Sequence, residues 1–121
     1  TTALGAEENT ISRMVCQRFL KNLGVTAELA DNGLHALEMA RERSFDVILM
    51  DCQMPIMDGF EATRQIRRAS LNQDTPIIAL TGLSGEGERQ DCLNAGMNDF
   101  IGKPFTQVQV HSALLQWLDG A

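Results

Sequence analysis

The sequence predicts a doubly wound α/β domain in which a five-stranded parallel sheet carries five helices on its two faces. Short apolar segments alternate with longer segments of helical periodicity five times along the chain, and this alternation is typical of consecutive βαβ units. Segments 47–50 and 76–80 are apolar at almost every position, which indicates strands buried on both faces. Because parallel crossovers are right-handed, few topologies remain, and we expect the common flavodoxin-like strand order 2-1-3-4-5.

The first strand and helix are predicted at 3–6 and 10–23. The strand is short and contains Gly5, and a glycine inside a strand costs roughly 0.5–1 kcal/mol. We therefore expect this end of the sheet to be frayed, although its place in the order is central. Gly24 ends the helix. The apolar side chains of the helix recur at helical spacing: Ile11, Met14, Val15, Phe19 and Leu23.

The remaining elements are bounded by turn residues and caps. Apolar and polar residues alternate in segment 25–30, which is typical of a strand near an edge of the sheet. Thr106 is a suitable N-cap for the last helix. The other boundaries follow from Gly, Pro and Asp-Gly breaks. The predicted strands are 25–30, 45–51, 76–81 and 99–101, and the predicted helices are 34–43, 60–69, a helix ending near 95, and 107–118.

Length and composition limit the classes of function. A chain of 121 residues is one domain, 1–121, and because it lacks an initiator Met we expect it to be excised from a longer protein. Its formal charge of −6 makes nucleic acid a poor partner. The sequence contains no apolar stretch of membrane-spanning length, so no membrane contact by this domain is expected. Its three widely spaced cysteines indicate reduced thiols and a cytoplasmic location.

Polar side chains gather where the predicted strands end. Glu7 and Glu8 follow the first strand, Asp51 ends the third, Thr81 ends the fourth and Lys103 follows the fifth. The carboxyl ends of parallel strands share one edge, where open α/β sheets place their chemistry. Three clustered carboxylates repel one another, and a hard cation such as Mg²⁺ would relieve this repulsion. The lysine and the threonine hydroxyl suit phosphoryl oxygens.

Each of these residues also has an ordinary structural explanation. Two glutamates near a helix start favour the helix dipole, a Thr after a strand is often a turn residue, and a Lys before a Pro is usually exposed. Taken singly these explanations would be preferred. The occurrence of all five residues at one predicted edge favours a functional site.

Longer motifs carry a resemblance to a known family. Segment 49–59, Leu-Met-Asp-Cys-Gln-Met-Pro-Ile-Met-Asp-Gly, closely resembles the phosphoacceptor loop of response-regulator receiver domains. Segments 76–81 and 95–105 continue the resemblance, and Glu7-Glu8-Asn9 matches the acidic pair of the family. Segments 92–97 and 114–118 look most like receivers fused to hybrid sensor histidine kinases.

The resemblance implies a phosphoacceptor in a two-component phosphorelay. Asp51 would take a phosphoryl group from a phosphohistidine with the help of Mg²⁺ or Mn²⁺. The metal would be bound by Glu8, Asp51 and the backbone carbonyl of Gln53, and through water by Glu7. The domain would catalyse only its own phosphorylation, while the parent chain would be a hybrid protein-histidine kinase.

The resemblance also implies a conformational switch. Thr81 and Lys103 would hold the transferred phosphoryl oxygens, and movement of Thr81 would let Phe100 turn inward. The bond between Lys103 and Pro104 would be cis, as in the family. The partner would be a histidine kinase domain or a histidine phosphotransfer protein that docks near the first helix and the loop over Lys103. The domain would be a monomer or weak dimer, and the resemblance also allows it to be the cytoplasmic domain of a membrane-anchored sensor kinase.

Glu8 departs from the family pattern, and two further positions affect the lifetime of the phosphorylated state. Most receivers have Asp where this chain has Glu8, so we expect weaker Mg²⁺ binding. Gln53 and Leu83 occupy the positions that orient or crowd the attacking water in the family. Because Leu83 is apolar, we expect slow self-dephosphorylation.

Three other functions compete with the phosphoacceptor. A pseudo-receiver would dock partners without phosphorylation; the intact Asp51, Thr81 and Lys103 argue against it, and Glu8 argues mildly for it. Aspartyl phosphatases of the haloacid-dehalogenase type place a second Asp two residues after the first, where this chain has Gln53. A flavodoxin-type flavin carrier would need a phosphate-binding loop after the first strand, which the sequence lacks.

Overall fold

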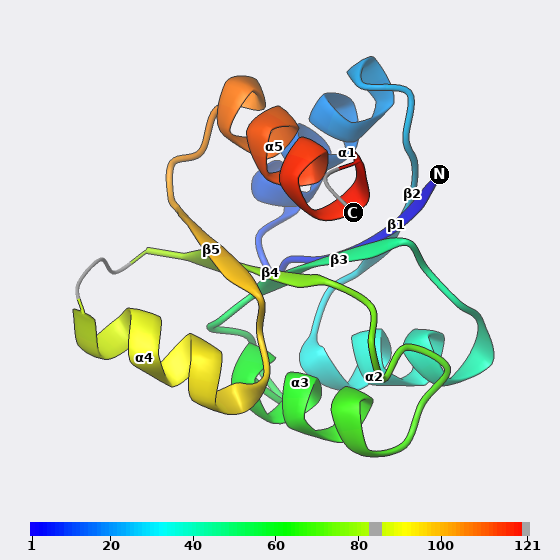
Figure 1. The fold of residues 1–121 in the computed structure, drawn as a ribbon, viewed down its shortest axis with the longest axis vertical. Coiled ribbons are helices and arrows are strands. Elements are labelled where there is room, and N and C mark those ends of the chain that lie inside the picture. The colour runs from blue at the N-terminus through cyan, green and yellow to red at the C-terminus, as the bar shows by residue number, and fades with distance from the viewer. Residues whose placement is uncertain (83–85, 120–121) are drawn as a thin grey trace.

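The computed structural model describes residues 1–82 and 86–119. A central sheet lies between two helical layers, with α1 and α5 on one face and α2, α3 and α4 on the other (Figure 1). This arrangement confirms the predicted doubly wound architecture. The elements are β1 Thr2–Ala6, α1 Thr10–Asn22, β2 Thr26–Ala30, α2 Gly33–Glu42, β3 Val47–Asp51, α3 Gly59–Arg68, β4 Ile77–Thr81, α4 Glu86–Ala95, β5 Asp99–Gly102, α5 Gln107–Leu114 and a final π-helical turn η1 Leu115–Asp119.

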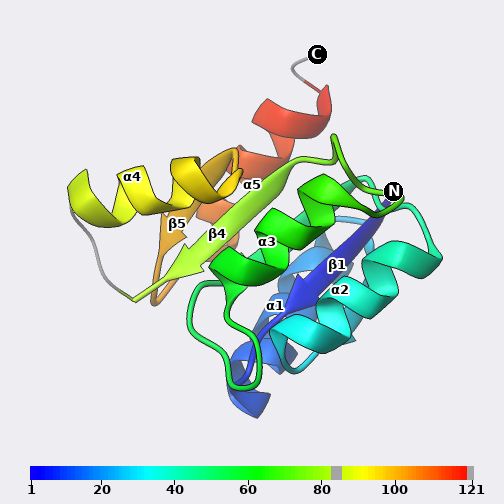
Figure 2. The same cartoon turned by 90° about the horizontal axis from the view of Figure 1, so that it is seen from below.

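The five strands are parallel and follow the order β2-β1-β3-β4-β5. The predicted order is therefore confirmed, with β2 at an edge. In the view from below, the arrows of β1 and β4 point in the same direction (Figure 2). Their carboxyl ends consequently lie together at one edge of the sheet.

The expectation that the first strand is frayed is wrong. β1 pairs over its full length with β2 and over four residues with β3, and Ala3, Leu4 and Ala6 are fully buried. Gly5 has a packing role, because a Cβ there would lie 3.3 Å from Leu29 Cδ2 and 3.4 Å from the sulfur of Cys16 on α1. The missing side chain lets α1 approach the strand closely, which offsets the cost of a glycine.

Two hydrophobic clusters cover the two faces of the sheet. Successive side chains of a strand point to opposite faces, so each buried strand contributes to both clusters. The cluster under α2, α3 and α4 includes Leu4, Ile48, Met50, Ile77 and Ala79, and the cluster under α1 and α5 includes Ala3, Val47, Leu49, Ile78 and Leu80.

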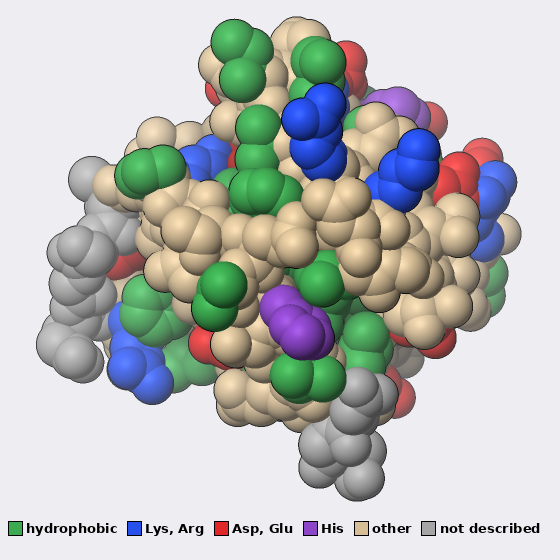
Figure 3. Space-filling view, turned by 90° about the horizontal axis from the view of Figure 1, so that it is seen from above, with side chains coloured by type: hydrophobic (Ala, Val, Ile, Leu, Met, Phe, Trp, Pro, Cys, Tyr) green, Lys and Arg blue, Asp and Glu red, His purple; other side chains and the backbone are tan. Residues whose placement is uncertain are grey.

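The apolar side chains of α1 do not all face the core. Cys16 and Leu20 are buried, whereas Ile11 and Met14 are 72% and 62% exposed. An apolar stripe at the start of this helix therefore remains on the surface. The space-filling view from the side of α1 and α5 shows exposed apolar side chains among polar ones (Figure 3).

The last helix differs from the prediction in its geometry. Thr106 forms a capping box with Gln109, as its type suggested, but the α-helix ends at Leu114 and continues as a π-helical turn to Asp119. Among the described residues, no helix has the length and apolar character required to span a membrane.

Candidate functional site

Three charged side chains meet at the carboxyl edge of the sheet. Glu7 follows β1, Asp51 is the last residue of β3 and Lys103 follows β5. Lys103 Nζ lies 3.0 Å from Glu7 Oε2 and 3.1 Å from Asp51 Oδ2. The ammonium group thus bridges two carboxyl groups from strands that are adjacent in the sheet.

These groups strongly affect one another because they are largely removed from water. The Glu7 and Asp51 side chains are 1% and 8% exposed, and that of Lys103 is 25% exposed. Burial, followed by the neighbouring Asp51 carboxyl, raises the pKa of Glu7 to about 7, although Lys103 opposes this change. Burial lowers the pKa of Lys103, but its two carboxylate neighbours outweigh burial and raise the pKa overall. The cluster is acidic and favours an additional positive charge.

The donor atoms at this edge fit a hard cation. Glu7 Oε1 is buried and accepts no hydrogen bond from any described residue, and an unpaired buried carboxylate oxygen is costly unless a ligand or water satisfies it. Carboxylate and carbonyl oxygens are the ligands that Mg²⁺ prefers. The orphaned oxygen beside Asp51 therefore fits a metal site at this position.

Glu8 and Gln53, the other expected metal ligands, are exposed. Arg13 Nη1 donates to the backbone oxygens of Glu7 and Glu8, at 2.8 and 2.7 Å, and so fixes the turn after β1. The backbone amide of Gln53 donates to Asp51 Oδ1 at 3.2 Å. Of the acidic pair, only Glu7 is buried against Asp51 and Lys103.

The loop after Asp51 is held by close backbone contacts. Gly59 N donates to Cys52 O, and a Cβ on Gly59 would lie 2.1 Å from the Asp51 carbonyl oxygen. Ile56 has a φ of 71° and lies between Pro55 O and Met57 N, which are hydrogen-bonded at 2.7 Å. This three-residue turn is a strained conformation for a β-branched residue. Only a glycine at position 59 therefore lets the end of the loop lie this close to the backbone of Asp51.

Thr81 ends β4 beside the charged cluster. It is 2% exposed, and its hydroxyl donates to Glu88 Oε1 at 2.9 Å. The backbone amide of Lys103 donates to the Thr81 carbonyl at 2.7 Å, which joins the two strand ends. The Lys103–Pro104 peptide bond is cis.

Phe100 on β5 is partly buried against the cluster under α2, α3 and α4. The guanidinium of Arg89 on α4 lies 5.4 Å from the centre of its ring. Phe100 therefore lies between the core and the surface, with a cation over its face. Leu83, the residue expected to affect dephosphorylation, lies outside the described residues.

Sequence reasoning missed two residues of this region, Arg13 and Glu88. Neither belongs to the strand ends: Arg13 is on α1 and Glu88 is on α4, where the glycines around it obscured the start of the helix. Their helical positions gave no signal of contact with the edge of the sheet. Only the packing of α1 and α4 brings them to the site.

Comparison with known proteins identifies the family of the chain. The family model of the response regulator receiver domain matches residues 3–115. Hybrid signal transduction histidine kinase A of Dictyostelium discoideum is 40% identical over 119 residues, which are 95% of this chain and 6% of that protein. Signal transduction histidine-protein kinase BarA of Escherichia coli is 35% identical over 120 residues, which are 99% of this chain and 13% of that protein. The chain therefore spans only a small part of these relatives.

Solved structures extend the comparison. The receiver domain of sensor histidine kinase PA1611 from Pseudomonas aeruginosa, with a magnesium ion coordinated in its active-site cleft, is 38% identical with a TM-score of 0.91, covering 98% of this chain and 97% of that one. The receiver domain of Saccharomyces cerevisiae Ssk1, crystallised with the histidine phosphotransfer protein Ypd1, is 26% identical with a TM-score of 0.90, covering 98% and 88%. The strand-end residues, the strand order and these matches together show that the chain belongs to the response regulator receiver domains of two-component signalling systems.

Proposed function

We propose that Asp51 accepts a phosphoryl group from a phosphohistidine and that the domain passes this signal on through a change in its surface. The observation that carries the proposal is the buried cluster in which Lys103 bridges Asp51 and Glu7. A purely structural ion pair with Lys103 would need only one carboxyl group. This cluster has two, and one oxygen of Glu7 has no hydrogen-bond partner among the described residues. A site for a cation and a phosphoryl group accounts for both.

The transfer step needs a carboxylate, a positive charge and a hydroxyl in the positions described. A carboxylate oxygen of Asp51 forms a bond to phosphorus while the bond from phosphorus to the histidine nitrogen breaks, and the departing imidazole takes up a proton. Lys103 and the hydroxyl of Thr81 bind oxygens of the transferred group. Catalysis of this kind depends on positioning and on charge stabilisation.

Mg²⁺, or Mn²⁺, would supply charge neutralisation between the Asp51 carboxylate and the incoming phosphoryl group. Asp51, Glu8 and the Gln53 carbonyl would bind it directly, and Glu7 would bind it through water. This role is supported by the orphaned Glu7 oxygen and by the magnesium ion of the PA1611 receiver.

The switch would begin with a change of hydrogen-bond partner. Thr81 donates to Glu88 in the present structure, and a phosphoryl oxygen on Asp51 would compete for the same hydroxyl. Movement of Thr81 would release Glu88 on α4 and open space for Phe100, which lies half-buried beside α4. The surface of α4 and β5 would thereby report the state of Asp51.

The phosphodonor would be a histidine phosphotransfer protein or a kinase domain that docks on α1. Ile11 and Met14 form an exposed apolar surface on this helix, which suits a helical partner. The complex of the Ssk1 receiver with Ypd1 supports this kind of partner. The parent protein would be a hybrid histidine kinase, which the names of the relatives support, and this domain would lie in the cytoplasm.

Phosphorylation by acetyl phosphate tests the proposal. With Mg²⁺ present, intact-mass analysis should detect one hydroxylamine-labile phosphoryl group, which Asp51→Asn abolishes. Asp58→Asn is the matched control, because Asp58 is an exposed carboxylate of the same loop that caps α3 and asparagine also serves as an N-cap. Labelling that survives Asp51→Asn would refute the assignment, and no labelling of the wild type would favour a docking module without phosphorylation.

Transfer from phosphorylated Ypd1 tests the docking surface. Met14→Glu should slow this transfer without changing labelling by acetyl phosphate. Leu71→Glu is the control, because Leu71 is 57% exposed but precedes β4 at the opposite edge of the sheet. Equal effects of the two substitutions would exclude α1 as the docking surface.

A further inference from the structure

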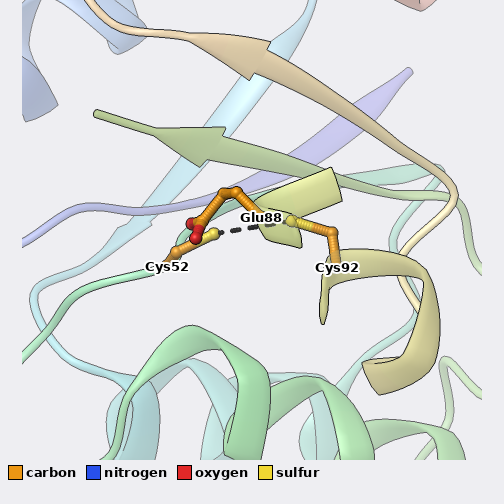
Figure 4. A group of neighbouring side chains, drawn as sticks. All are labelled: Cys52, Glu88 and Cys92. Carbon is orange, nitrogen blue, oxygen red and sulfur yellow. Dashed lines mark hydrogen bonds between the residues drawn. The ribbon is translucent and has the colours of Figure 1, made fainter. Parts of the chain in front are cut away.

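A second cluster of potential metal ligands lies behind the phosphoacceptor loop. Cys52 follows Asp51, while Glu88 and Cys92 lie one turn apart on α4. The two sulfur atoms and a carboxylate oxygen of Glu88 all lie within 4.8 Å of one another. Figure 4 shows the three side chains directed toward one another from the loop and the helix.

The separation of the two sulfur atoms suits a shared metal ion. They lie 4.0 Å apart, twice the ~2.05 Å of a disulfide bond. Two thiolates, each ~2.3 Å from a tetrahedral zinc ion, lie about 3.8 Å apart. The observed spacing therefore needs only a small adjustment to bind a metal and a much larger one to form a disulfide.

The surroundings of the cluster also favour metal binding over disulfide formation. Cys52 and Cys92 are each 1% exposed. Such thiols react slowly with oxidants. Glu88 is half-buried and adds a carboxylate, which has no role in a disulfide but is a usual zinc ligand.

We propose that Cys52, Glu88 and Cys92 form a binding site for a thiophilic divalent cation such as Zn²⁺, separate from the oxygen-lined Mg²⁺ site. The cation would displace one proton from each thiol, so that two thiolates and one carboxylate bind it. A water molecule would fill the fourth position on the side of the half-buried glutamate. Mixed sulfur and oxygen ligands favour zinc over magnesium.

The site would be linked to the switch through Glu88. Oxygen Oε1 of Glu88 accepts the hydrogen bond from Thr81, and a carboxylate has acceptor capacity for a second partner such as a metal ion. A bound cation would fix Glu88 and hold the start of α4 to the loop that contains Cys52. This consequence rests on the proposed phosphorylation, whereas binding of the metal does not.

Cobalt absorption tests binding directly. Co²⁺ is titrated into the 121-residue chain in the presence of a non-thiol reductant and excess Mg²⁺, so that cobalt at the oxygen site is suppressed. One equivalent should produce sulfur-to-cobalt charge-transfer absorption, which Zn²⁺ then displaces. Cys52→Ser and Cys92→Ser should each abolish or strongly reduce the absorption. Glu88→Gln should weaken zinc binding about tenfold or more, since changes around metal ligands cost ~10–100-fold.

Cys16→Ser is the matched control, because Cys16 is equally buried but lies on α1 under the other face of the sheet. It should retain the absorption, and circular dichroism should show that all the variants fold. Absence of sulfur-to-cobalt absorption in the wild type would overturn the proposal. So would absorption that persists when Cys52 and Cys92 are both replaced. Asp51→Asn should retain metal binding while losing phosphorylation, so failure of one proposal is distinguishable from failure of the other.

Discussion

Replacing Glu7 by Gln should remove a pH-dependent loss of protein stability. This loss arises because burial raises the pKa of the Glu7 carboxyl group. Its pKa is raised from 4.5 to about 7 in the folded protein. Between these values the folded chain holds a proton that the unfolded chain has released. The free energy of unfolding contributed by Glu7 is therefore fully present below pH 4.5 and falls as the pH rises through about 7.

The size of this effect follows from the shift. At ~1.4 kcal/mol per pKa unit, the change from 4.5 to about 7 corresponds to about 3 kcal/mol. Lys103 contributes no slope in this window, because its raised pKa moves it further above its ordinary value of 10.5. Magnesium should reduce the loss, since a cation beside Glu7 favours the ionised form.

Urea unfolding in the presence of a metal chelator measures the effect. The free energy of unfolding is compared between wild type and Glu7→Gln from about pH 5 to pH 8. The wild type should lose about 2–3 kcal/mol more than the variant over this range. Glu8→Gln is the matched control, because Glu8 is the exposed neighbour, and it should keep the wild-type slope. Parallel curves for wild type and Glu7→Gln would refute the reasoning.

Four other outcomes are expected. Glu8→Asp should bind Mg²⁺ more tightly in calorimetric titration, because the shorter side chain is usual in receivers; equal affinities would contradict this. Asn72→Ala should lower the free energy of unfolding by about 3 kcal/mol or more, since this buried side chain makes four hydrogen bonds to the backbone and to a threonine; a loss below about 1 kcal/mol would show that water replaces them. Gly59→Ala should reduce both stability and acetyl phosphate labelling, because its Cβ would lie 2.1 Å from the Asp51 carbonyl oxygen; full labelling would mean that the loop accommodates it. Trp117, whose indole donates to an aspartate in β5 at 3.0 Å, should change little in fluorescence on Mg²⁺ addition, and a large quench would contradict its placement away from the metal.

The fold class was predictable because its signals are local. Uninterrupted apolar runs such as 47–50 indicate strands buried on both faces, and the regular spacing of strands and helices leaves few topologies. The first strand was misjudged for the opposite reason. The contribution of Gly5 depends on how closely Cys16 approaches it, and that distance is a property of the packed helix and not of the strand sequence.

Local sequence signals also could not show which part of α1 is exposed. Helical periodicity identified the helix but treated all its apolar residues alike. Only the position of α1 on the sheet separates the buried Cys16 and Leu20 from the exposed Ile11 and Met14. Periodicity gives the direction of a side chain relative to its own helix, and tertiary packing decides whether another element covers it.

By itself the sequence determined the strand order and the edge at which Glu7, Asp51, Thr81 and Lys103 gather, since parallel strands necessarily end at a common edge. The tertiary structure decided which member of the acidic pair is buried against Asp51, because adjacent residues in the turn after β1 point in different directions. It also brought Glu88 and Cys92 from α4 to Thr81 and Cys52. These contacts depend on how a helix rests against the sheet, and no local pattern of residues specifies that distance.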